Sequence, residues 1–127
     1  MSMKHITGLG GVFIKAKDPK ALAAWYQDNL GIGFNNNTYV DFPFTGEDGK
    51  LTTGSNVLTF FKADSAYFNP STTPVMLNLR VNDLFALLAE LKTKGIESVG
   101  EPMDEDYGKF GWILDLEGNK IELWQPA

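Results

Sequence analysis

The chain has 127 residues, of which 43% are hydrophobic and 21% charged, with a formal net charge of -5 and no cysteine. This length suits a single domain with one core. The absence of cysteine excludes disulfide bonds, thiolate catalysis and every metal site with Cys ligands. The negative charge, with 11 Lys and Arg residues scattered along the chain, argues against a nucleic-acid partner.

The hydropathy of the chain bears on its location. No apolar run approaches the length of a membrane span, so we expect no membrane partner. The start Met-Ser-Met-Lys-His-Ile-Thr-Gly lacks the apolar segment of a secretory signal. The cytoplasm is therefore the expected compartment.

The first third of the chain predicts a strand followed by a helix. Residues Gly10 to Ala16 alternate as a strand does. Asp18 and Pro19 then predict the start of a helix, because Asp is a good N-cap and Pro suits the first helical position. An apolar stripe at helical spacing follows, and Gly31 is placed to end the helix. The stripe consists of Leu22, Trp25, Tyr26 and Leu30.

The middle of the chain predicts two strands, a loop and a linker. Residues Tyr39 to Phe44 and Val57 to Lys62 have the apolar and β-branched composition of strands. Between them, Thr45 to Ser55 contains three glycines among charged residues and is expected to be a mobile surface loop. Ala63 to Pro74 predicts an irregular linker that is anchored by the aromatic residues Tyr67 and Phe68.

The opening pattern then recurs. Residues Met76 to Val81 alternate, Asp83 is an N-cap, and an apolar helical stripe runs up to Gly95. That stripe consists of Leu84, Leu87, Leu88 and Leu91. We expect a short strand over Ile96 to Val99 and an acidic turn over Pro102 to Asp106.

A β-hairpin is predicted over Tyr107 to Gln125. Two alternating runs flank the turn sequence Asp-Leu-Glu-Gly-Asn at 115–119. On the second strand, the period of two places Ile121 and Leu123 on one face and Lys120, Glu122 and Trp124 on the other. A carboxylate is thus expected among aromatic side chains on one face of a sheet.

The two halves of the chain match in kind when Asp18 is aligned with Asp83. We infer one domain, 1–127, made of two repeats at about 8–65 and 74–126. Each repeat is a strand, a helix and then about three strands. Such a unit leaves one sheet face bare, so it needs a partner unit or a second subunit. The alternative is chance similarity between two amphipathic units.

The paired βαβββ pattern, Lys17-Asp18-Pro19 at the helix entry and the ending Gly-Asn-Lys-Ile-Glu-Leu-Trp-Gln-Pro at 118–126 resemble the vicinal oxygen chelate superfamily. That group includes glyoxalase I, bleomycin-resistance proteins and extradiol dioxygenases. The resemblance implies an α+β fold in which two βαβββ modules form a curved mixed sheet, shaped as a cup, that binds a ligand. It also implies a homodimer. The motif is specific for the fold and does not select an activity.

In this family, metal ligands come from the first and last strands of each module. By motif, the resemblance places those positions at Gly11, Thr59, Met76 and Glu122. Only Glu122 is a competent ligand for a hard divalent ion, so we expect no metal cofactor; the alternative is a divalent metal such as Zn, Ni or Fe. The single imidazole, His5, is expected to be an exposed histidine, or a ligand if the terminus folds back.

The same alternation predicts which side chains face the cup. The ligand-binding set is Phe13, Phe61, Met76, Asn78, Arg80, Trp112, Glu122 and Trp124. Apolar walls with a few convergent polar groups are typical of a small-molecule pocket. The alternative is that the aromatic residues fill the cup as core and that Arg80 and Glu122 form an internal salt bridge. Glu122 acting alone as a general base is a further option that no other residue supports, so the catalytic residues stay unknown.

Three functions compete. The leading hypothesis is a metal-free binding protein that sequesters a small aromatic or cationic compound. The second is a metal-dependent glyoxalase I-like lyase or dioxygenase, and the third a non-catalytic interaction domain. The sequence leaves open whether the protein is an enzyme and favours the view that it is not.

Overall fold

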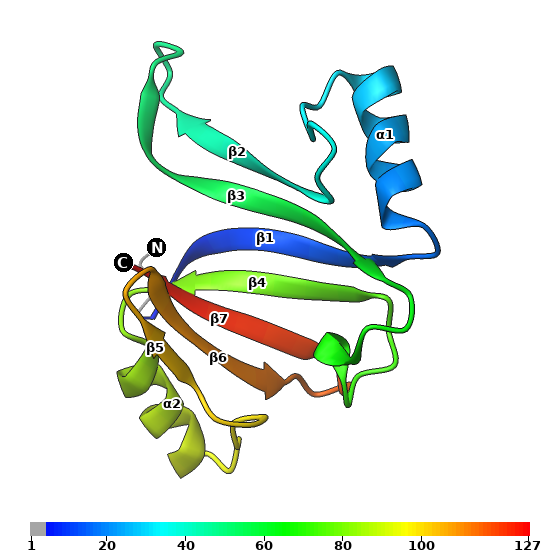
Figure 1. The fold of residues 1–127 in the computed structure, drawn as a ribbon. Coiled ribbons are helices and arrows are strands. Elements are labelled where there is room, and N and C mark those ends of the chain that lie inside the picture. Colours follow the sequence, from blue (N-terminus) through cyan, green and yellow to red (C-terminus); the bar gives the residue numbers. More distant parts are fainter. Residues whose placement is uncertain (1–4) are drawn as a thin grey trace.

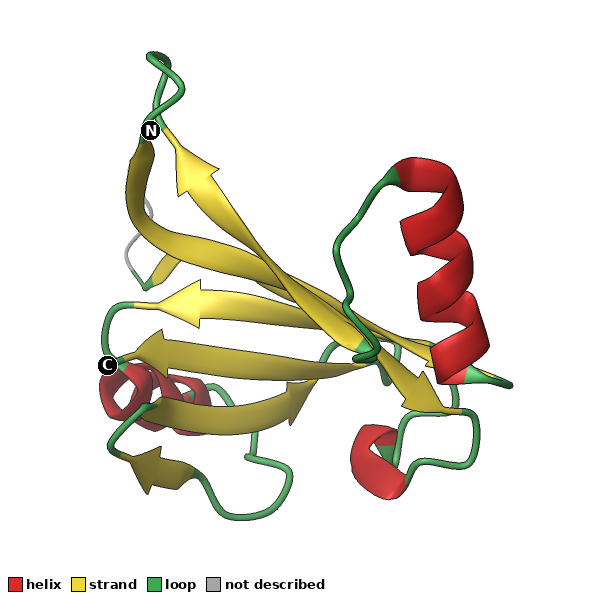
Figure 2. Cartoon of the chain, turned by 45° about the horizontal axis from the view of Figure 1, so that its top comes forward, coloured by secondary structure: helices red, strands yellow, loops and turns green. Residues whose placement is uncertain are grey.

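The computed structural model describes residues 5–127, in which a curved seven-stranded sheet has both helices on its outer face (Figures 1 and 2). The strand order is β2-β3-β1-β4-β7-β6-β5. Strands are β1 (Ile6–Ala16), β2 (Tyr39–Thr45), β3 (Leu51–Lys62), β4 (Val75–Val81), β5 (Met103–Glu105), β6 (Gly108–Leu114) and β7 (Lys120–Pro126); helices are α1 (Pro19–Leu30), η1 (Ala66–Phe68, 3-10) and α2 (Leu84–Thr93). The predicted α+β class with a curved mixed sheet is confirmed. No helix within residues 5–127 has the length and apolar character needed to cross a membrane.

The two halves of the chain have similar strand pairing. In the first half β1 lies parallel to β3, and in the second half β4 lies parallel to β7. The halves meet where β1 and β4 pair in antiparallel fashion. After its helix, the first half has two strands and the second has three. The sheet therefore has two wings that meet along β1 and β4.

Both predicted helix starts are confirmed. The Asp18 carboxylate accepts a hydrogen bond from the backbone N–H of Ala21 at 3.0 Å. The Asp83 carboxylate accepts one from the N–H of Ala86 at 3.1 Å. A side-chain cap of this kind stabilises a helix by about 1 kcal/mol.

The predicted stripe of α1 is correct in part, since Leu22 and Tyr26 pack against the core. Trp25 and Leu30 are 55% and 59% exposed, whereas Ala23 is buried against Phe34 and Phe60. The reason is packing: a small residue at the centre of the contact lets the helix approach the sheet closely, which turns Trp25 and Leu30 outward. In α2 the prediction holds, since Leu84 and Leu87 are buried, and Leu88 and Leu91 pack against them.

Three irregular segments also differ from the predictions. Residues 51–55, expected in a mobile loop, belong to β3 and pair with β2. Residues 103–105, expected in an acidic turn, form β5 against β6. Residues 96–99 form no strand; there the Val99 N–H donates to the Trp112 carbonyl at 2.7 Å. In each case a neighbouring strand edge, which local composition does not reveal, decides the structure.

The inner face of the sheet carries a separate hydrophobic cluster. Phe13, Met76 and Trp112 from three strands pack there with Phe68 of η1, which is fully buried. The segment between the two halves, expected to be a linker with aromatic anchors, thus folds over one end of the inner face. The concave surface is partly filled and partly open.

Candidate functional site: the cup

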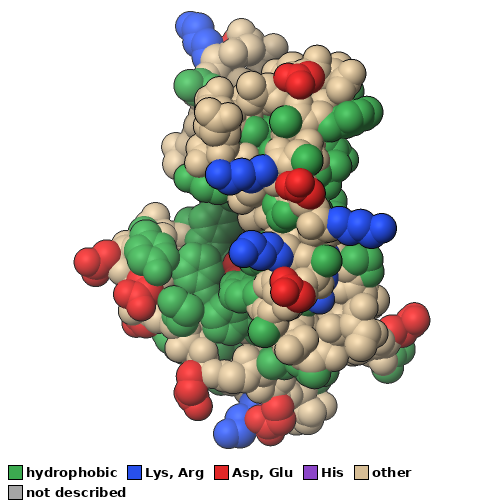
Figure 3. All heavy atoms as spheres, turned by 45° about the vertical axis from the view of Figure 1, so that its right-hand side comes forward, with side chains coloured by type: hydrophobic (Ala, Val, Ile, Leu, Met, Phe, Trp, Pro, Cys, Tyr) green, Lys and Arg blue, Asp and Glu red, His purple; other side chains and the backbone are tan. Residues whose placement is uncertain are grey.

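A cavity of about 290 Å³ opens on the concave face of the sheet, and we call it the cup. It is lined by Phe13, Val57, Thr59, Phe61, Tyr67, Asn78, Tyr107, Phe110, Glu122 and Trp124. Figure 3 shows the molecule hollowed by a recess with hydrophobic side chains along its floor and charged side chains near its rim. Aromatic walls with few polar groups suit the binding of a largely apolar small molecule.

Strand register brings the polar groups of the cup together. Glu122 on β7 is paired with Asn78 on β4 and with Trp112 on β6. Because residues in register on adjacent strands project to the same face, these three side chains form one row across the floor. Tyr67 reaches the same row from η1, outside the sheet.

The Glu122 carboxylate is 3% exposed and accepts hydrogen bonds from three side chains. Asn78 Nδ2 donates to Oε1 at 2.6 Å, and Trp112 Nε1 donates to Oε2 at 3.0 Å. The Tyr67 hydroxyl also donates to Oε2. A buried carboxylate is stable only when its oxygens are paired in this way.

Tyr67 is held in its donating state by its surroundings. Burial raises the pKa of its hydroxyl well above the ordinary value, and the charge of Glu122 and the hydrogen bond to it act in the same direction. The ring of Tyr67 stacks on Phe61, with centroids 5.4 Å apart. The ring of Tyr67 therefore forms part of the wall of the cup, and its hydroxyl belongs to the polar row.

Lys120 fastens η1 to the sheet. Its Nζ donates to the Tyr67 carbonyl at 2.7 Å and lies over the rings of Tyr67 and Trp112, at 5.3 and 5.7 Å from their centroids. Burial lowers the pKa of this lysine, whereas the charge of Glu122 raises it. The lysine thus anchors the backbone of Tyr67 to β7 and places a positive charge near the Glu122 carboxylate.

Arg80 lies beyond the polar row, two residues along β4 from Asn78. Its guanidinium is 5.0 Å from the centroid of the Trp124 ring and 5.6 Å from that of Phe44. Nη1 donates to the Ser55 carbonyl at 3.2 Å. The internal Arg80–Glu122 salt bridge, predicted above as an alternative, is not formed within the described residues 5–127.

The structure distributes the predicted ligand-binding residues between the wall of the cup and its support. Those that line the cavity are Phe13, Phe61, Asn78, Glu122 and Trp124. Met76 and Trp112 lie beneath, in the inner hydrophobic cluster, and Arg80 lies beside Trp124.

Sequence reasoning missed four lining residues, Val57, Tyr67, Tyr107 and Phe110. Phe110 lies two positions before Trp112 on the same strand, so the alternation that indicated Trp112 could also have found it. Tyr67 gave no such signal, because its place depends on the path of a segment with no regular period.

The positions that the resemblance implies for metal ligands do not fit a metal here. Gly11 has no side chain, and a Cβ there would lie 2.4 Å from the Val57 carbonyl oxygen. Met76 is 1% exposed, and both oxygens of Glu122 already accept hydrogen bonds. Within residues 5–127 no group of three or more His, Asp or Glu side chains is placed to hold an ion. One neutral hydroxyl, on Thr59, does not make a site.

His5 lies away from the cup. Its Nε2 is 2.9 Å from Glu90 Oε2, and Glu90 belongs to α2 on the outer face. The side chain of His5 is 17% exposed, so the expectation of an exposed histidine is wrong. The backbone of His5 is fixed near the start of α2 as well, because its carbonyl accepts a hydrogen bond from the Asn82 N–H at 3.1 Å.

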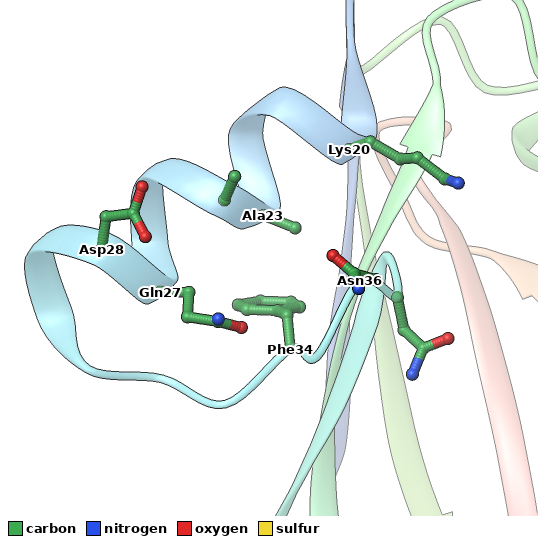
Figure 4. Close-up of a pocket in the computed structure, with 8 residues that line it drawn as sticks. Lys20, Ala23, Gln27, Asp28, Phe34 and Asn36 are labelled. Carbon is green, nitrogen blue, oxygen red and sulfur yellow. The ribbon is translucent and has the colours of Figure 1, made fainter.

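A second cavity, of about 280 Å³, lies outside the sheet between α1 and the segment that follows it (Figure 4). Lys20, Gln27, Asp28 and Asn36 surround it, with Phe34 at its base. Phe34 is 2% exposed and belongs to the core under α1. Gln27 Oε1 accepts from the Asn35 N–H at 2.8 Å, so part of this polar lining closes the local chain. We assign no function to this cavity.

Comparison with known proteins gives a family match along nearly the whole chain. The model of the Glyoxalase/Bleomycin resistance protein/Dioxygenase superfamily matches residues 3–123. No curated protein matches the chain.

Solved structures share the fold at low sequence identity. Methylmalonyl-CoA epimerase from Mycobacterium tuberculosis is 22% identical with a TM-score of 0.65, over 100% of this chain and 93% of its own. A Streptomyces coelicolor methylmalonyl-CoA epimerase in complex with 2-nitronate-propionyl-CoA is 20% identical with a TM-score of 0.70, over 96% and 99%. A superfamily member from Vibrio splendidus 12B01 is 13% identical with a TM-score of 0.55, over 98% and 99%.

Proposed function

Because this chain belongs to the Glyoxalase/Bleomycin resistance protein/Dioxygenase superfamily, we propose that its cup is a metal-free binding site for a small, largely aromatic molecule. The observation that carries this proposal is that the Glu122 carboxylate is already hydrogen-bonded within the protein. The one carboxylate at a family metal position already accepts hydrogen bonds from Asn78, Trp112 and Tyr67. Its oxygens serve the polar floor of the cup, and the residues that line the cup within 5–127 include no second carboxylate and no imidazole.

The walls of the cup favour an aromatic ligand. Phe13 and Phe61 lie on one side with ring centroids 5.5 Å apart. Phe110 and Trp124 lie on the other and stack with an interplanar angle of 2°. A planar ligand would replace water between such rings, since apolar and aromatic area drives binding in pockets of this kind. A cationic ligand is less favoured, because Glu122 is already paired.

Tryptophan fluorescence tests the proposal directly. The chain has three tryptophans, of which Trp124 lines the cup, Trp112 lies beneath it and Trp25 is 55% exposed on α1. We expect planar aromatic compounds to quench emission with saturation in a Trp25→Phe variant, in which only the two tryptophans of the cup remain. A Trp124→Phe variant should lose most of the signal. No saturable quenching by any compound in a diverse aromatic set would instead favour an interaction domain with a closed cup.

A metal-dependent enzyme is the alternative from another class. The similarity to methylmalonyl-CoA epimerases supports it only at the level of the fold, because the identities are near 20%. After incubation with Zn, Ni or Fe and removal of excess ion, our proposal predicts no stoichiometric metal. One bound ion per chain that disappears in a Glu122→Gln variant would contradict the proposal and favour the enzyme.

We further propose that two copies associate through the outer face of the central strands. Leu9 on β1 and Val75 and Leu77 on β4 are 45%, 41% and 42% exposed, between the two helices. Burial of such apolar area in a dimer is favourable. Sedimentation equilibrium should give a dimer for the natural chain and a monomer for Leu77→Lys, whereas Leu116→Lys, at an exposed turn residue, should remain dimeric. A monomeric natural chain would refute this.

A further inference from the structure

Arg80 lies between two aromatic rings beside the cup, next to the lining residue Trp124. The guanidinium lies against Trp124, which lines the cavity, and against Phe44 of β2. Its Nη1 reaches across β1 to the Ser55 carbonyl on β3, two residues from the lining residue Val57. Gly54 leaves room for this crossing, since a Cβ there would lie 3.3 Å from Nη2 and 3.0 Å from the Phe44 ring.

The charge of this guanidinium is not neutralised by the protein. A guanidinium has five N–H donors, and the hydrogen bond to the Ser55 carbonyl uses one of them. No carboxylate forms an ion pair with Arg80 within the part of the chain that the structure describes. Aromatic rings lower the energy of a cation without consuming its donors. Arg80 thus retains N–H groups and a positive charge beside an apolar cavity, against its lining residue Trp124.

The charge of Glu122, unlike that of Arg80, is already paired by neighbouring side chains. Three donors surround this carboxylate, and Lys120 lies near it. A positively charged ligand would have to displace one of those donors. A negatively charged ligand would need to displace nothing at Arg80. The unmet charge of the cup is therefore positive, even though the chain as a whole carries a net charge of -5.

We propose that the ligand of the cup is an aromatic acid, whose ring lies between the aromatic walls and whose oxyanion pairs with Arg80. This inference rests on the proposed binding function and adds the charge of the ligand to it. Carboxylate and phosphate share the required chemistry, since both accept charge-assisted hydrogen bonds from a guanidinium. The planar fork held by Trp124 and Phe44 is oriented before the ligand arrives, which lowers the entropy cost of binding.

Three probes that share one ring system test whether the cup prefers a negatively charged ligand. We would measure the affinities of 2-naphthoate, 2-naphthyl phosphate and neutral 2-naphthamide by fluorescence in the Trp25→Phe background. At least one acid should bind roughly tenfold more tightly than the amide, which corresponds to about 1.4 kcal/mol for a charge-assisted hydrogen bond. The comparison between carboxylate and phosphate then identifies the kind of acid.

Variants assign the effect to Arg80. Arg80→Met should reduce the affinity for the preferred acid to that for the amide, and Arg80→Lys, which keeps the charge without the planar fork, should retain part of the preference. Lys92→Met, on the outer face of α2, removes one positive charge far from the cup and should leave the preference unchanged. Near-ultraviolet circular dichroism would verify that each variant is folded.

The outcomes separate this inference from the proposed function. Equal affinity of the natural chain for the acids and the amide would overturn the inference and leave a working cup, and this comparison needs no variant. A preference for acids that survives in folded Arg80→Met would also overturn it. Failure of all three probes to bind would count against the proposed function itself.

Discussion

Tyr67 and Glu122 are 55 residues apart in the chain and share a hydrogen bond at the floor of the cup. One comes from the segment between the two halves, and the other from the last strand. The contact joins that segment to the sheet and gives the only carboxylate among the lining residues a phenolic donor. Several measurable properties depend on this pair and its neighbours.

Replacement of Glu122 by Gln should lower the free energy of unfolding by about 1–3 kcal/mol, the cost of mispaired buried polar groups. An amide has one acceptor oxygen, so its NH₂ group must face either Asn78 or the donors Tyr67 and Trp112. Urea denaturation measures the change. Glu117→Gln, in the exposed turn before β7, is the matched control and should be neutral. If both variants lose the same stability, the polar floor does not contribute as described.

Gly10→Ala should disrupt the same row from the neighbouring strand. A Cβ at this position would lie 2.0 Å from Asn78 Oδ1 and 3.0 Å from the Trp124 ring. Overpacking of this kind costs about 1–3 kcal/mol. In Gly33→Ala the nearest atom is 3.8 Å away, so that variant should unfold at the same temperature as the natural chain. A melting temperature for Gly10→Ala equal to that of the control would show that Asn78 can move without cost.

Tyr67→Phe should change how stability depends on alkaline pH. The pKa of Tyr67 is raised by burial and by Glu122, so the stability that its hydroxyl contributes is complete below the ordinary tyrosine value of about 10 and is lost as pH rises beyond it. The variant should be less stable than the natural chain at neutral pH, and the gap should narrow above about pH 10. The lowered pKa of Lys120 makes stability rise with pH, but this contribution is present in both proteins and does not change the gap between them.

Unfolding midpoints measured from neutral to alkaline pH would give this difference. The tyrosinate absorbance provides a second readout, because the raised pKa of Tyr67 means that its ionisation in the folded protein should require a pH well above 10, the ordinary tyrosine value. A gap that widens with rising pH would argue against the assigned direction.

Asp115→Asn should weaken the last hairpin in a way that depends on acidic pH. The Asn119 side chain and backbone N–H donate to the Asp115 carboxylate, each at 2.9 Å, and lower its pKa. A lowered pKa means that the contribution is present above the ordinary value of 3.8 and disappears as pH falls below it. The natural chain should therefore melt at a higher temperature than the variant at pH 7 and at the same temperature in strong acid. Asp64→Asn, in the exposed loop after β3, is the control and should melt at the same temperature as the natural chain at both pH values.

Local signals in the sequence predicted the elements that they control. The caps Asp18 and Asp83 and the turn at 115–119 act within a few residues, and each lies where expected. Alternation likewise placed Asn78 and Glu122 on the concave face, because the strand period depends only on the backbone.

The remaining features depend on contacts between distant segments. The exposure of Trp25 follows from how closely α1 approaches the sheet, and β5 exists because β6 offers an unpaired edge. Tyr67 reaches Glu122 only through the fold of η1 over the inner face. Neither periodicity nor composition contains that information, and so the donors that occupy Glu122 could only be seen in three dimensions.

The antiparallel pair β1 and β4 is the seam along which the two wings of the sheet meet, and the walls of the cup come from both wings. Two register shifts interrupt this seam, between Ile6 and Gly8 and between Leu9 and Gly11. Register shifts of this kind increase local twist, so we expect the angle between the two wings, and with it the width of the cup, to depend on this pair of strands. A substitution that changes the twist at these shifts should therefore change both the width of the cup and the position of Phe13 and Asn78, the lining residues on these two strands.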